Sequence, residues 1–280
     1  MVENDLSGYD LLLEMTIPSK TKVVGITGPP GAGKSTLVNA LLNIWSKGGK
    51  KIAVLAVDPS SPFNFGALLG DRIRMTAFYD NPNVYIRSLA SRGALGGLSA
   101  KILEITDIVK QAPFDYLIIE TVGVGQSEVE IAGLADCTIV TLVPEGGDVV
   151  QTLKAGIMEI ADIFVVNKAD RELSETLYRN LRMLVHEKTT TGIEIPVVKV
   201  VATDNLGVEE LAEKIDHFFV QVHNTDRKLQ MLTEKAWQLI QKRQMKKYHR
   251  QALMEELKVQ LLSPQFNLYA FIDDYVSLIH

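Results

Sequence analysis

A disulfide pair, a basic charge excess and a long apolar run are all missing from this chain. Its only cysteine, Cys137, lies in the apolar run 137–143 and cannot form a disulfide within the chain, which favours a reducing compartment. The formal net charge of -5 is not the basic balance of general nucleic-acid binders. No apolar stretch is long enough to cross a bilayer, and the acidic start MVENDLSGYD is unlike a signal peptide.

These absences predict a cytoplasmic protein with no nucleic-acid and no membrane partner. A mitochondrial-matrix location is the alternative if the chain is eukaryotic and a transit peptide has been removed. With 46% hydrophobic and 22% charged residues, the composition is that of an ordinary globular protein. A length of 280 residues allows one large α/β domain and an appendage.

Apolar runs and helical patterns alternate over most of the chain. Strands are expected at Lys22–Thr27, Lys51–Val57, Asn83–Arg87, Asp115–Glu120, Cys137–Val143, Ile163–Asn167 and Val197–Val201. Helical patterns lie between most of them, for example at Lys34–Ser46, Ser99–Gln111 and Glu209–His223. The pattern predicts a doubly wound α/β fold with a mostly parallel sheet covered on both faces.

Three segments are expected along the chain. Residues 1–21 form a short N-terminal segment with an amphipathic piece at Tyr9–Met15, and residues 22–224 form the α/β domain. Residues 225–280 form a helical extension, in which Asp226–Leu262 is predicted as one long helix. Ser263-Pro264 ends that helix, and Asn267–Ile279 is predicted as a second, shorter one.

The extension carries two surface features. Its apolar stripe, which includes Trp237, needs a covering surface, either the chain's own α/β domain or a second subunit. Its basic run is typical of a solvated helix face, with a phosphate-bearing ligand or an acidic partner as the alternative. The run consists of Lys242, Arg243, Lys246, Lys247, His249 and Arg250.

The strongest motif is a phosphate-binding loop, which matches G-x-x-x-x-G-K-[ST] without a mismatch. It follows a predicted strand and opens a predicted helix, so a chance glycine turn is the weaker interpretation. Backbone N–H groups would cradle phosphate oxygens, Lys34 would reach the β- and γ-phosphates, and the Ser35 hydroxyl would bind Mg²⁺. The nucleotide-binding residues expected here are Gly28, Pro29, Pro30, Gly31, Ala32, Gly33, Lys34, Ser35 and Thr36.

A second motif, Asn167-Lys168-Ala169-Asp170, follows another predicted strand and indicates guanine recognition. A carboxylate at Asp170 accepts hydrogen bonds from the N1–H and the exocyclic amine of guanine, whereas adenine would leave it unpaired. Asn167 and Lys168 would brace the loop and pack on the base. The backbone N–H of Ala202 is expected at guanine O6. The alternative is a solvated turn in which Asp170 caps a helix.

Two carboxylates are candidates for the metal end of the site. Glu120 lies at the carboxyl end of the run Asp115–Glu120 and suits an outer-sphere Mg²⁺ ligand, and Gly123 would sense the γ-phosphate. Asp58 follows another strand and is a metal or water-positioning candidate, or a plain turn aspartate. Val124 stands where related hydrolases place a water-orienting glutamine, which predicts slow intrinsic hydrolysis unless Gln126 substitutes.

The motifs together resemble the MeaB/ArgK family of P-loop GTPases, over about Lys22 to Phe219. The matching segments are GITGPPGAGKSTL, AVDPSSP, LLGDRIRM, SLASRGALGGLS, IIETVGVGQSEVEIA, Glu145-Gly146-Gly147-Asp148 with Gln151 and Lys154, and VVNKAD. The resemblance implies a SIMIBI-class GTPase that binds GTP, GDP and Mg²⁺. It also implies a homodimer that serves as a chaperone of an adenosylcobalamin-dependent acyl-CoA mutase, such as methylmalonyl-CoA mutase.

The same resemblance assigns roles to individual residues. It implies that Lys34, Asp58, Glu120 and Lys154 are catalytic, that Ser35, Asp58 and Glu120 hold the metal, and that the 148–154 segment is a partner-responsive switch. Lys154 and Arg92 are candidates for stabilising the transferred phosphoryl group, with solvated side chains as the alternative. Pro62–Gly66, which contains two phenylalanines, departs from the family pattern, and the segment before the first strand is short.

Other functions compete with this interpretation. A metallochaperone GTPase for another metalloenzyme is disfavoured by five unclustered histidines and one cysteine. A small-molecule kinase or transport-linked ATPase is disfavoured by Asp170, which argues against ATP. A nucleotide sensor without turnover is the remaining alternative.

Overall fold

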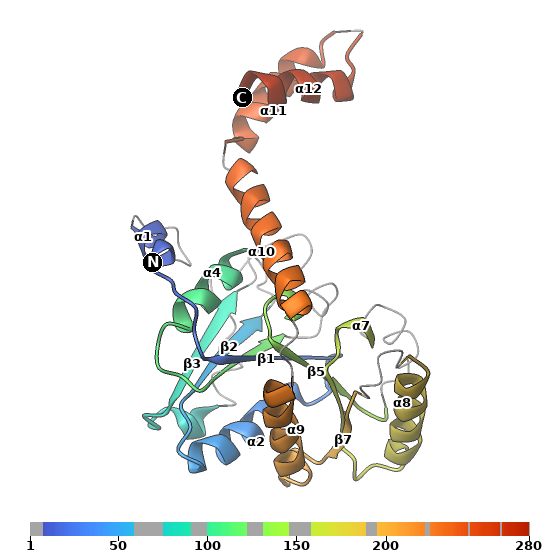
Figure 1. The fold of residues 1–280 in the computed structure, drawn as a ribbon. Coiled ribbons are helices and arrows are strands. Elements are labelled where there is room, and N and C mark those ends of the chain that lie inside the picture. Colours follow the sequence, from blue (N-terminus) through green and yellow to red (C-terminus); the bar gives the residue numbers. More distant parts are fainter. Residues whose placement is uncertain are drawn as a thin grey trace. The chain divides into compact units, whose positions relative to one another are not determined.

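The computed structural model describes residues 8–58, 75–90, 100–121, 131–145, 158–188, 195–221, 225–245, 247–263 and 265–279. The chain divides into two compact units, Met1–Thr225 and Asp226–His280. Figure 1 shows the helices and strands of both units.

The first unit is built on a parallel sheet of seven strands. They are β1 (Lys22–Thr27), β2 (Ile52–Asp58), β3 (Val84–Ala90), β4 (Tyr116–Thr121), β5 (Cys137–Leu142), β6 (Ile163–Asn167) and β7 (Val197–Val200). Their order is β3-β2-β4-β1-β5-β6-β7, and every pair is parallel. All seven predicted strands and the parallel α/β class are confirmed. The chain reverses its direction of winding next to β1, where such sheets bind ligands at the carboxyl ends of their strands.

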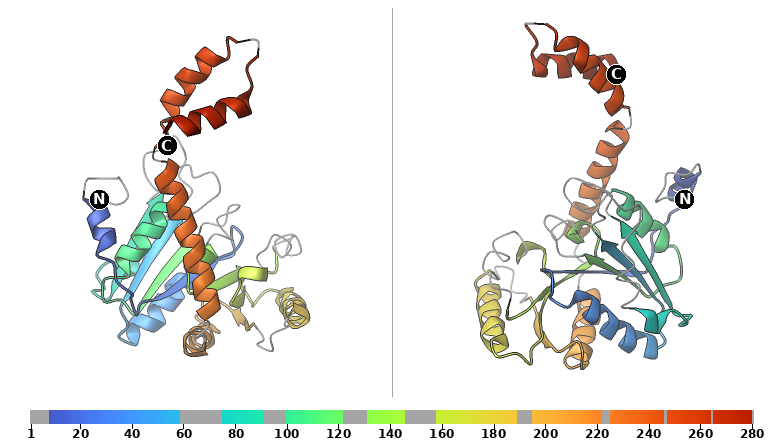
Figure 2. Two further views of the ribbon diagram at one scale, coloured as in Figure 1. Left: turned by 45° about the horizontal axis from the view of Figure 1, so that its top comes forward. Right: turned by 180° about the vertical axis from the view of Figure 1, so that it is seen from behind.

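Helices cover both faces of this sheet (Figures 1 and 2). The helical elements are α1 (Tyr9–Glu14), α2 (Lys34–Lys47), η2 (Thr76–Phe78), α4 (Ala100–Val109), η3 (Ile131–Gly133), α7 (Met158–Ile160), α8 (Ser174–Lys188) and α9 (Val208–Gln221). Alternate strand residues point to opposite faces. Those on one face pack against α2 and α9, and those on the other pack against α4, η3, α7 and α8.

A polar cluster joins the amino ends of two central strands to the helices on one face. The ring of Tyr116 in β4 stacks on Trp45 of α2, with centroids 4.1 Å apart and planes 2° apart. The Tyr116 hydroxyl donates a hydrogen bond to Asp216 of α9. Lys22 Nζ, at the start of β1, lies 2.8 Å from the same Asp216 oxygen. The cluster therefore ties α2 and α9 to β1 and β4 by directional contacts as well as by apolar packing.

The charges of the cluster shift two pKa values in opposite directions. Burial, together with the hydrogen bond to Asp216 and the charge of Asp216, raises the pKa of Tyr116. Partial burial works against ionisation of Asp216, but the hydrogen bonds from Lys22 and Tyr116 outweigh it and lower the pKa of Asp216. Asp216 is therefore a carboxylate that is more stable ionised in the folded protein than in the unfolded chain.

The second unit contains three helices, α10 (Thr225–Met245), α11 (Arg250–Gln260) and α12 (Leu268–Ile279). The prediction of one helix over Asp226–Leu262 is wrong, because the helix ends at Met245 and His249 has extended backbone angles, φ -104° and ψ 116°. A continuous helix would stack like charges four residues apart at Lys242/Lys246, Arg243/Lys247 and Lys246/Arg250, which is destabilising. The break also brings the rings of Tyr248 and Tyr275 to 6.2 Å.

The last helix begins where the sequence predicts it, with Asn267 as its cap. Asn267 Oδ1 accepts hydrogen bonds from the backbone N–H groups of Tyr269, at 2.9 Å, and Ala270, at 3.1 Å. Over the described parts of the chain, no helix combines the length and the apolar character that crossing a membrane requires.

The Lys22–Tyr116–Asp216 cluster predicts a stability contribution that depends on pH. Asp216→Asn removes the ion pair, and because Lys22 and Asp216 are 35% and 50% exposed, the loss at pH 7 should be below about 1 kcal/mol. A lowered carboxylate pKa contributes stability above the unfolded value, about 3.9, and loses it as pH falls through the folded value. The difference between wild type and variant should therefore shrink under acid, as measured by urea unfolding at pH 7 and pH 3.

Glu213→Gln, at an exposed position of the same helix, provides the control. An Asp216→Asn protein that matches this control at both pH values would contradict the cluster's contribution.

Candidate functional site

The phosphate-binding motif forms the turn between β1 and α2. Its glycines have positive φ angles, 139° at Gly28, 76° at Gly31 and 82° at Gly33. A Cβ atom at Gly28 would lie 2.0 Å from the Thr141 carbonyl oxygen of β5, and one at Gly33 would lie 2.4 Å from Asn167 Nδ2. At these two positions glycine is required both by the backbone angle and by the close approach of a neighbouring strand end.

Lys34 is the first residue of α2, and its side chain folds over the loop. Its ammonium group donates hydrogen bonds to the carbonyl oxygens of Gly28, at 2.8 Å, and Pro29, at 3.0 Å. Lys34 is buried, with 6% of its surface exposed. The loop, a buried cation and the N-terminus of the 14-residue helix α2 thus combine as sources of positive potential at one point.

Oxygen groups suited to a hard cation meet beside this lysine. The Ser35 hydroxyl donates a 2.6 Å hydrogen bond to Glu120 Oε1, and Glu120 is buried at the end of β4. Hydroxyl and carboxylate oxygens are ligands that Mg²⁺ accepts, so the donor set fits this ion. Among the described residues, no group of three or more His, Cys, Asp or Glu side chains is arranged for a metal. Ser35 and Glu120 are thus residues that could hold Mg²⁺ at this point.

The strand register brings Asp58 to the same edge of the sheet. Ala56 of β2 pairs with Glu120 of β4, and Asp58 is the last residue of β2. A buried contact also joins the ends of β1 and β4, where the Thr121 hydroxyl donates to Thr27 Oγ1 at 3.1 Å. No motif in the sequence indicates this pair, because two threonines at strand ends have no distinctive spacing.

Asn167, at the end of β6, connects three loops through one buried side chain. Its Nδ2 group donates to the Ala32 carbonyl oxygen in the phosphate loop at 2.9 Å. Its Oδ1 atom accepts hydrogen bonds from the backbone N–H groups of Lys168, at 2.8 Å, and Ala202, at 3.2 Å. With 2% exposure, Asn167 fixes the loop after β1 against the loops after β6 and β7. The Ala202 N–H is thus donated to Asn167 in this structure.

The loop after Asn167 holds Asp170 at an exposed position. Lys168 has a left-handed φ of 55°, and the Ala169 N–H donates to the Val200 carbonyl oxygen at 3.1 Å. Ser174 Oγ donates to the Ala169 carbonyl oxygen at 2.8 Å. Helix α8 begins only at Ser174, so Asp170 is not its N-cap, and the helix-capping alternative for this residue is wrong.

Next to this loop lies an ion pair that no sequence motif indicates. Arg171 donates a hydrogen bond to Glu145, which follows β5, and both side chains are about half exposed. The hydrogen bond from Arg171 outweighs partial burial and, with the nearby charges of Arg171 and Lys168, lowers the pKa of Glu145. Only the pairing of β5 with β6 brings these two residues, 26 positions apart, together.

Several predicted site residues lie outside the described residues. They are Gly123, Val124, Gln126, Asp148, Gln151, Lys154, Arg92 and the segment 62–66. The remaining predicted residues lie along the carboxyl edge of the sheet, with Lys34, Ser35 and Glu120 next to one another and Asn167 tied to the phosphate loop.

A family model described as methylmalonyl Co-A mutase-associated GTPase MeaB matches residues 2–257 of this chain. A Pyrococcus horikoshii protein named as a GTPase is 48% identical over 221 residues, which cover 77% of this chain and 70% of that protein. The GTPase ArgK of Escherichia coli is 33% identical over 278 residues, covering 92% of this chain and 83% of ArgK.

A mouse protein and two solved structures extend these matches. The mouse mitochondrial methylmalonic aciduria type A homolog is 43% identical over 150 residues, covering 54% of this chain and 36% of the homolog. The crystal structure of an LAO/AO transport system kinase has a TM-score of 0.64 at 26% identity, covering 91% of this chain and 74% of that one. The hydrogenase maturation factor HypB of Archaeoglobus fulgidus has a TM-score of 0.50 at 22% identity, covers 77% of this chain and 94% of its own, and shares the fold.

The contact between Gly33 and Asn167 predicts different effects of one substitution at two glycines. Gly31→Ala places a Cβ in open space, so only the left-handed backbone is penalised, by about 1–2 kcal/mol. Gly33→Ala has the same backbone penalty and also displaces the Asn167 amide, which leaves a buried polar group unpaired at a further cost of about 1–3 kcal/mol. Urea unfolding without nucleotide should show the larger loss for Gly33→Ala, and equal losses would contradict the close approach.

Proposed function

The chain belongs to the MeaB family of methylmalonyl Co-A mutase-associated GTPases, and from this we propose that it serves as a GTP-hydrolysing chaperone of an adenosylcobalamin-dependent acyl-CoA mutase. The client we expect is a mutase of the methylmalonyl-CoA type, whose cofactor loading the GTPase gates and whose activity it protects. The reaction is hydrolysis of GTP to GDP and phosphate. The contact that carries the nucleotide assignment is the Asn167 hydrogen bond to Ala32, which fixes a guanine-type loop against a phosphate loop.

We assign the phosphates to the turn between β1 and α2. The backbone N–H groups of residues 31–36 bind the phosphate oxygens, and Lys34 leaves the carbonyl oxygens of Gly28 and Pro29 to reach the β- and γ-phosphates. Glycine at positions 28 and 33 supports this assignment, because larger residues would clash with Thr141 and Asn167. The loop's role in the reaction is to bind the transferred phosphoryl group and neutralise its charge.

Ser35 and Glu120 are the residues that would hold Mg²⁺, with Asp58 as a third candidate at the same sheet edge. When bound, Mg²⁺ supplies positive charge that offsets the negative charge building up on the phosphate oxygens. Glu120 orients the Ser35 hydroxyl through their 2.6 Å hydrogen bond. We propose that Gly123 contacts the γ-phosphate and that Lys154 stabilises the transition state. Val124 lacks a group that orients water, which supports slow hydrolysis without the partner.

The base lies, in this proposal, against the loop that begins at Asn167. Asp170 accepts hydrogen bonds from the N1–H and amine of guanine, and its exposed position at the carboxyl edge of the sheet leaves it open to a ligand. Lys168 covers one face of the base, and the backbone at Ala202 lies next to its O6 atom. The mouse relative that is named for methylmalonic aciduria supports the choice of client.

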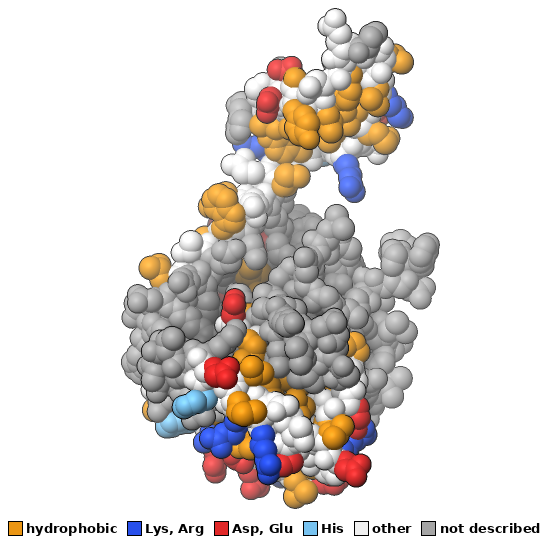
Figure 3. All heavy atoms as spheres, turned by 90° about the vertical axis from the view of Figure 1, so that its right-hand side faces the viewer, with side chains coloured by type: hydrophobic (Ala, Val, Ile, Leu, Met, Phe, Trp, Pro, Cys, Tyr) orange, Lys and Arg blue, Asp and Glu red, His pale blue; other side chains and the backbone are white. Residues whose placement is uncertain are grey.

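We also propose that the protein is a homodimer formed through its C-terminal unit. Tyr275 is the only buried residue among those described in this unit. The large apolar residues exposed on it are Leu229, Leu232, Trp237, Ile240, Met245, Met254, Val259, Leu261, Leu262, Leu268, Tyr269 and Ile272. Hydrophobic side chains gather over the α11–α12 end (Figure 3). So much exposed apolar surface on so small a unit is typical of a protein interface.

For its compartment, we propose the cytoplasm, or the mitochondrial matrix if the protein is eukaryotic. The reducing compartment expected from a single cysteine fits both, and that cysteine, Cys137, is buried.

Asp170→Asn is predicted to change the choice of base. The amide no longer pairs with the guanine amine, and its remaining hydrogen bond with N1–H is no longer charge-assisted, so GTP affinity should fall by about 100-fold or more. Xanthine has a carbonyl where guanine has the amine, so the same variant should gain XTP affinity. Glu172→Gln, exposed in the same turn, is the control. Equilibrium binding of GTP, XTP and ATP to both variants measures the effect, and an unchanged GTP preference would show that another residue reads the base.

The client is tested by turnover with and without a mutase. Phosphate release from GTP and ATP is measured with Mg²⁺, alone and with an adenosylcobalamin-dependent acyl-CoA mutase from the same source. GTP turnover should be slow alone and should rise with the mutase. Lys34→Ala removes the phosphate-binding cation, so it should abolish turnover and serves as the blank for contaminating activity. GTP turnover that ignores the mutase would leave a GTPase with a different partner.

A further inference from the structure

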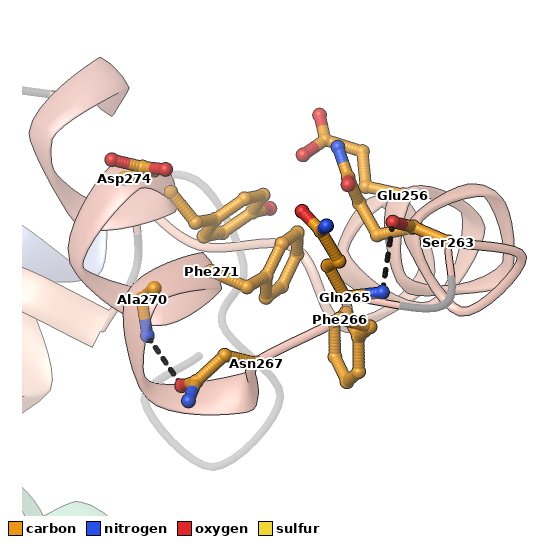
Figure 4. A pocket seen from close by; sticks show the side chains of 10 residues that line it. Glu256, Ser263, Gln265, Phe266, Asn267, Ala270, Phe271 and Asp274 are labelled. Atoms are coloured by element: carbon orange, nitrogen blue, oxygen red, sulfur yellow. Dashed lines mark hydrogen bonds between the residues drawn. The ribbon is translucent and has the colours of Figure 1, made fainter.

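A cleft of about 250 Å³ lies between α11 and α12 of the C-terminal unit (Figure 4). Its walls include the rings of Phe266, Phe271 and Tyr275 and the carboxylates of Glu256 and Asp274. Neighbouring rings lie close together, with centroids 5.8 Å apart for Phe271 and Tyr275 and 6.1 Å apart for Phe266 and Phe271. The cleft therefore combines an aromatic wall with negative charge.

This combination selects cations. Aromatic faces attract an ammonium or guanidinium group within about 6 Å, and carboxylates add direct ion pairs. No lysine or arginine lines the cleft, and neither carboxylate forms an ion pair with another described residue. A basic side chain that enters the cleft would thus meet two uncommitted negative groups and stacked rings.

The same unit carries the complementary charge on its other half. Residues 226–250 contain eight lysines or arginines and two acidic residues, whereas residues 251–280 contain one lysine and four acidic residues. Lys247 and Arg250, which flank the turn between α10 and α11, are exposed and do not line the cleft of their own chain. Each copy of the unit therefore offers both a cation-binding cleft and exposed cations.

The turn and the cleft are neighbours on one surface. Tyr248, between the two basic residues, has its ring 6.2 Å from that of Tyr275, which lines the cleft. In a two-fold dimer, both copies use the same surface, so a contact of one residue with a different residue of the partner occurs a second time in the reverse direction. A two-fold axis that passes beside Tyr248 and Tyr275 would bring each basic turn over the cleft of the other copy.

We propose that the aromatic, acidic cleft between α11 and α12 binds Lys247 or Arg250 of a second copy of this chain, and that this exchange sets the register of the dimer. The inference rests on the proposed homodimer and names its specific contact. The exposed apolar residues Met254, Val259 and Tyr269 belong to the same two helices and supply nonspecific area that this charged contact would orient.

A charge-swap experiment tests the contact in the full-length protein. One variant, Lys247→Glu with Arg250→Glu, reverses the basic turn, and a second, Glu256→Lys with Asp274→Lys, reverses the cleft. The control, Glu255→Lys with Asp273→Lys, makes the same charge change on the same helices at exposed positions that do not line the cleft. Sedimentation velocity over a concentration series measures the dimer dissociation constant, and far-ultraviolet circular dichroism verifies that each variant retains the helices of wild type.

Each reversed variant alone should dissociate at least about tenfold more readily than wild type, as expected for an interfacial charge pair turned repulsive. An equimolar mixture of the two should dimerise like wild type. In the mixed dimer the reversed turn meets the reversed cleft at one contact, and the native turn meets the native cleft at the other. The control should match wild type. Raised salt should weaken the wild-type dimer.

The outcomes separate this inference from the dimer itself. If both reversed variants dimerise with the dissociation constant of wild type, the cleft contact is overturned and the homodimer is left intact. Weakened variants that the mixture does not restore would also overturn the pairing of turn and cleft. A wild-type protein that stays monomeric at every concentration would overturn the homodimer and the contact together.

Discussion

The buried amide of Asn167 is the constraint on which the candidate site depends. It donates to Ala32 and accepts from the backbone N–H groups of Lys168 and Ala202, so loops that follow three different strands are held by one side chain. A buried polar group that loses its partner costs about 1–3 kcal/mol, so these loops are held together or released together. The same amide explains why residue 33 is a glycine, because a Cβ atom there would lie 2.4 Å from Asn167 Nδ2. Phosphate loop and base loop are in this sense one structural element.

The parallel sheet makes this arrangement possible. Because all seven strands run the same way, the phosphate turn after β1, Glu120 at the end of β4 and Asn167 at the end of β6 reach one edge. The Thr27–Thr121 contact and the Gly28–Thr141 approach then fix β1 against its two neighbours at that edge. At the opposite edge, the Lys22–Tyr116–Asp216 cluster fixes the same strands to α2 and α9. The central strands are thus anchored at both ends, which keeps the site's backbone in place.

The two units solve the problem of apolar surface in different ways. The first buries three clusters of apolar residues between its sheet and its helices. The second has too few elements to enclose a core, and in its described part only Tyr275 is buried. Its apolar surface and its separated charges fit a unit that completes itself by association. Under the proposed function, nucleotide chemistry belongs to the first unit and assembly to the second.

The sequence by itself determined the α/β class, the seven strands and the phosphate turn. Apolar periodicity and glycine spacing are local features, and they set backbone conformation through interactions between residues close along the chain. The sequence did not determine the break after Met245, because the helical pattern of apolar residues continues through the basic run 242–250. The like charges of that run lie next to one another only when the run is helical, so their repulsion is not visible in the apolar pattern. Nor did it reveal the Glu145–Arg171 ion pair, the Thr27–Thr121 contact or the cleft beside Phe271, which exist only where distant segments meet. Tertiary structure decided these contacts, because the order of the strands and the reversal between helices set which residues become neighbours. Spacing along the chain does not.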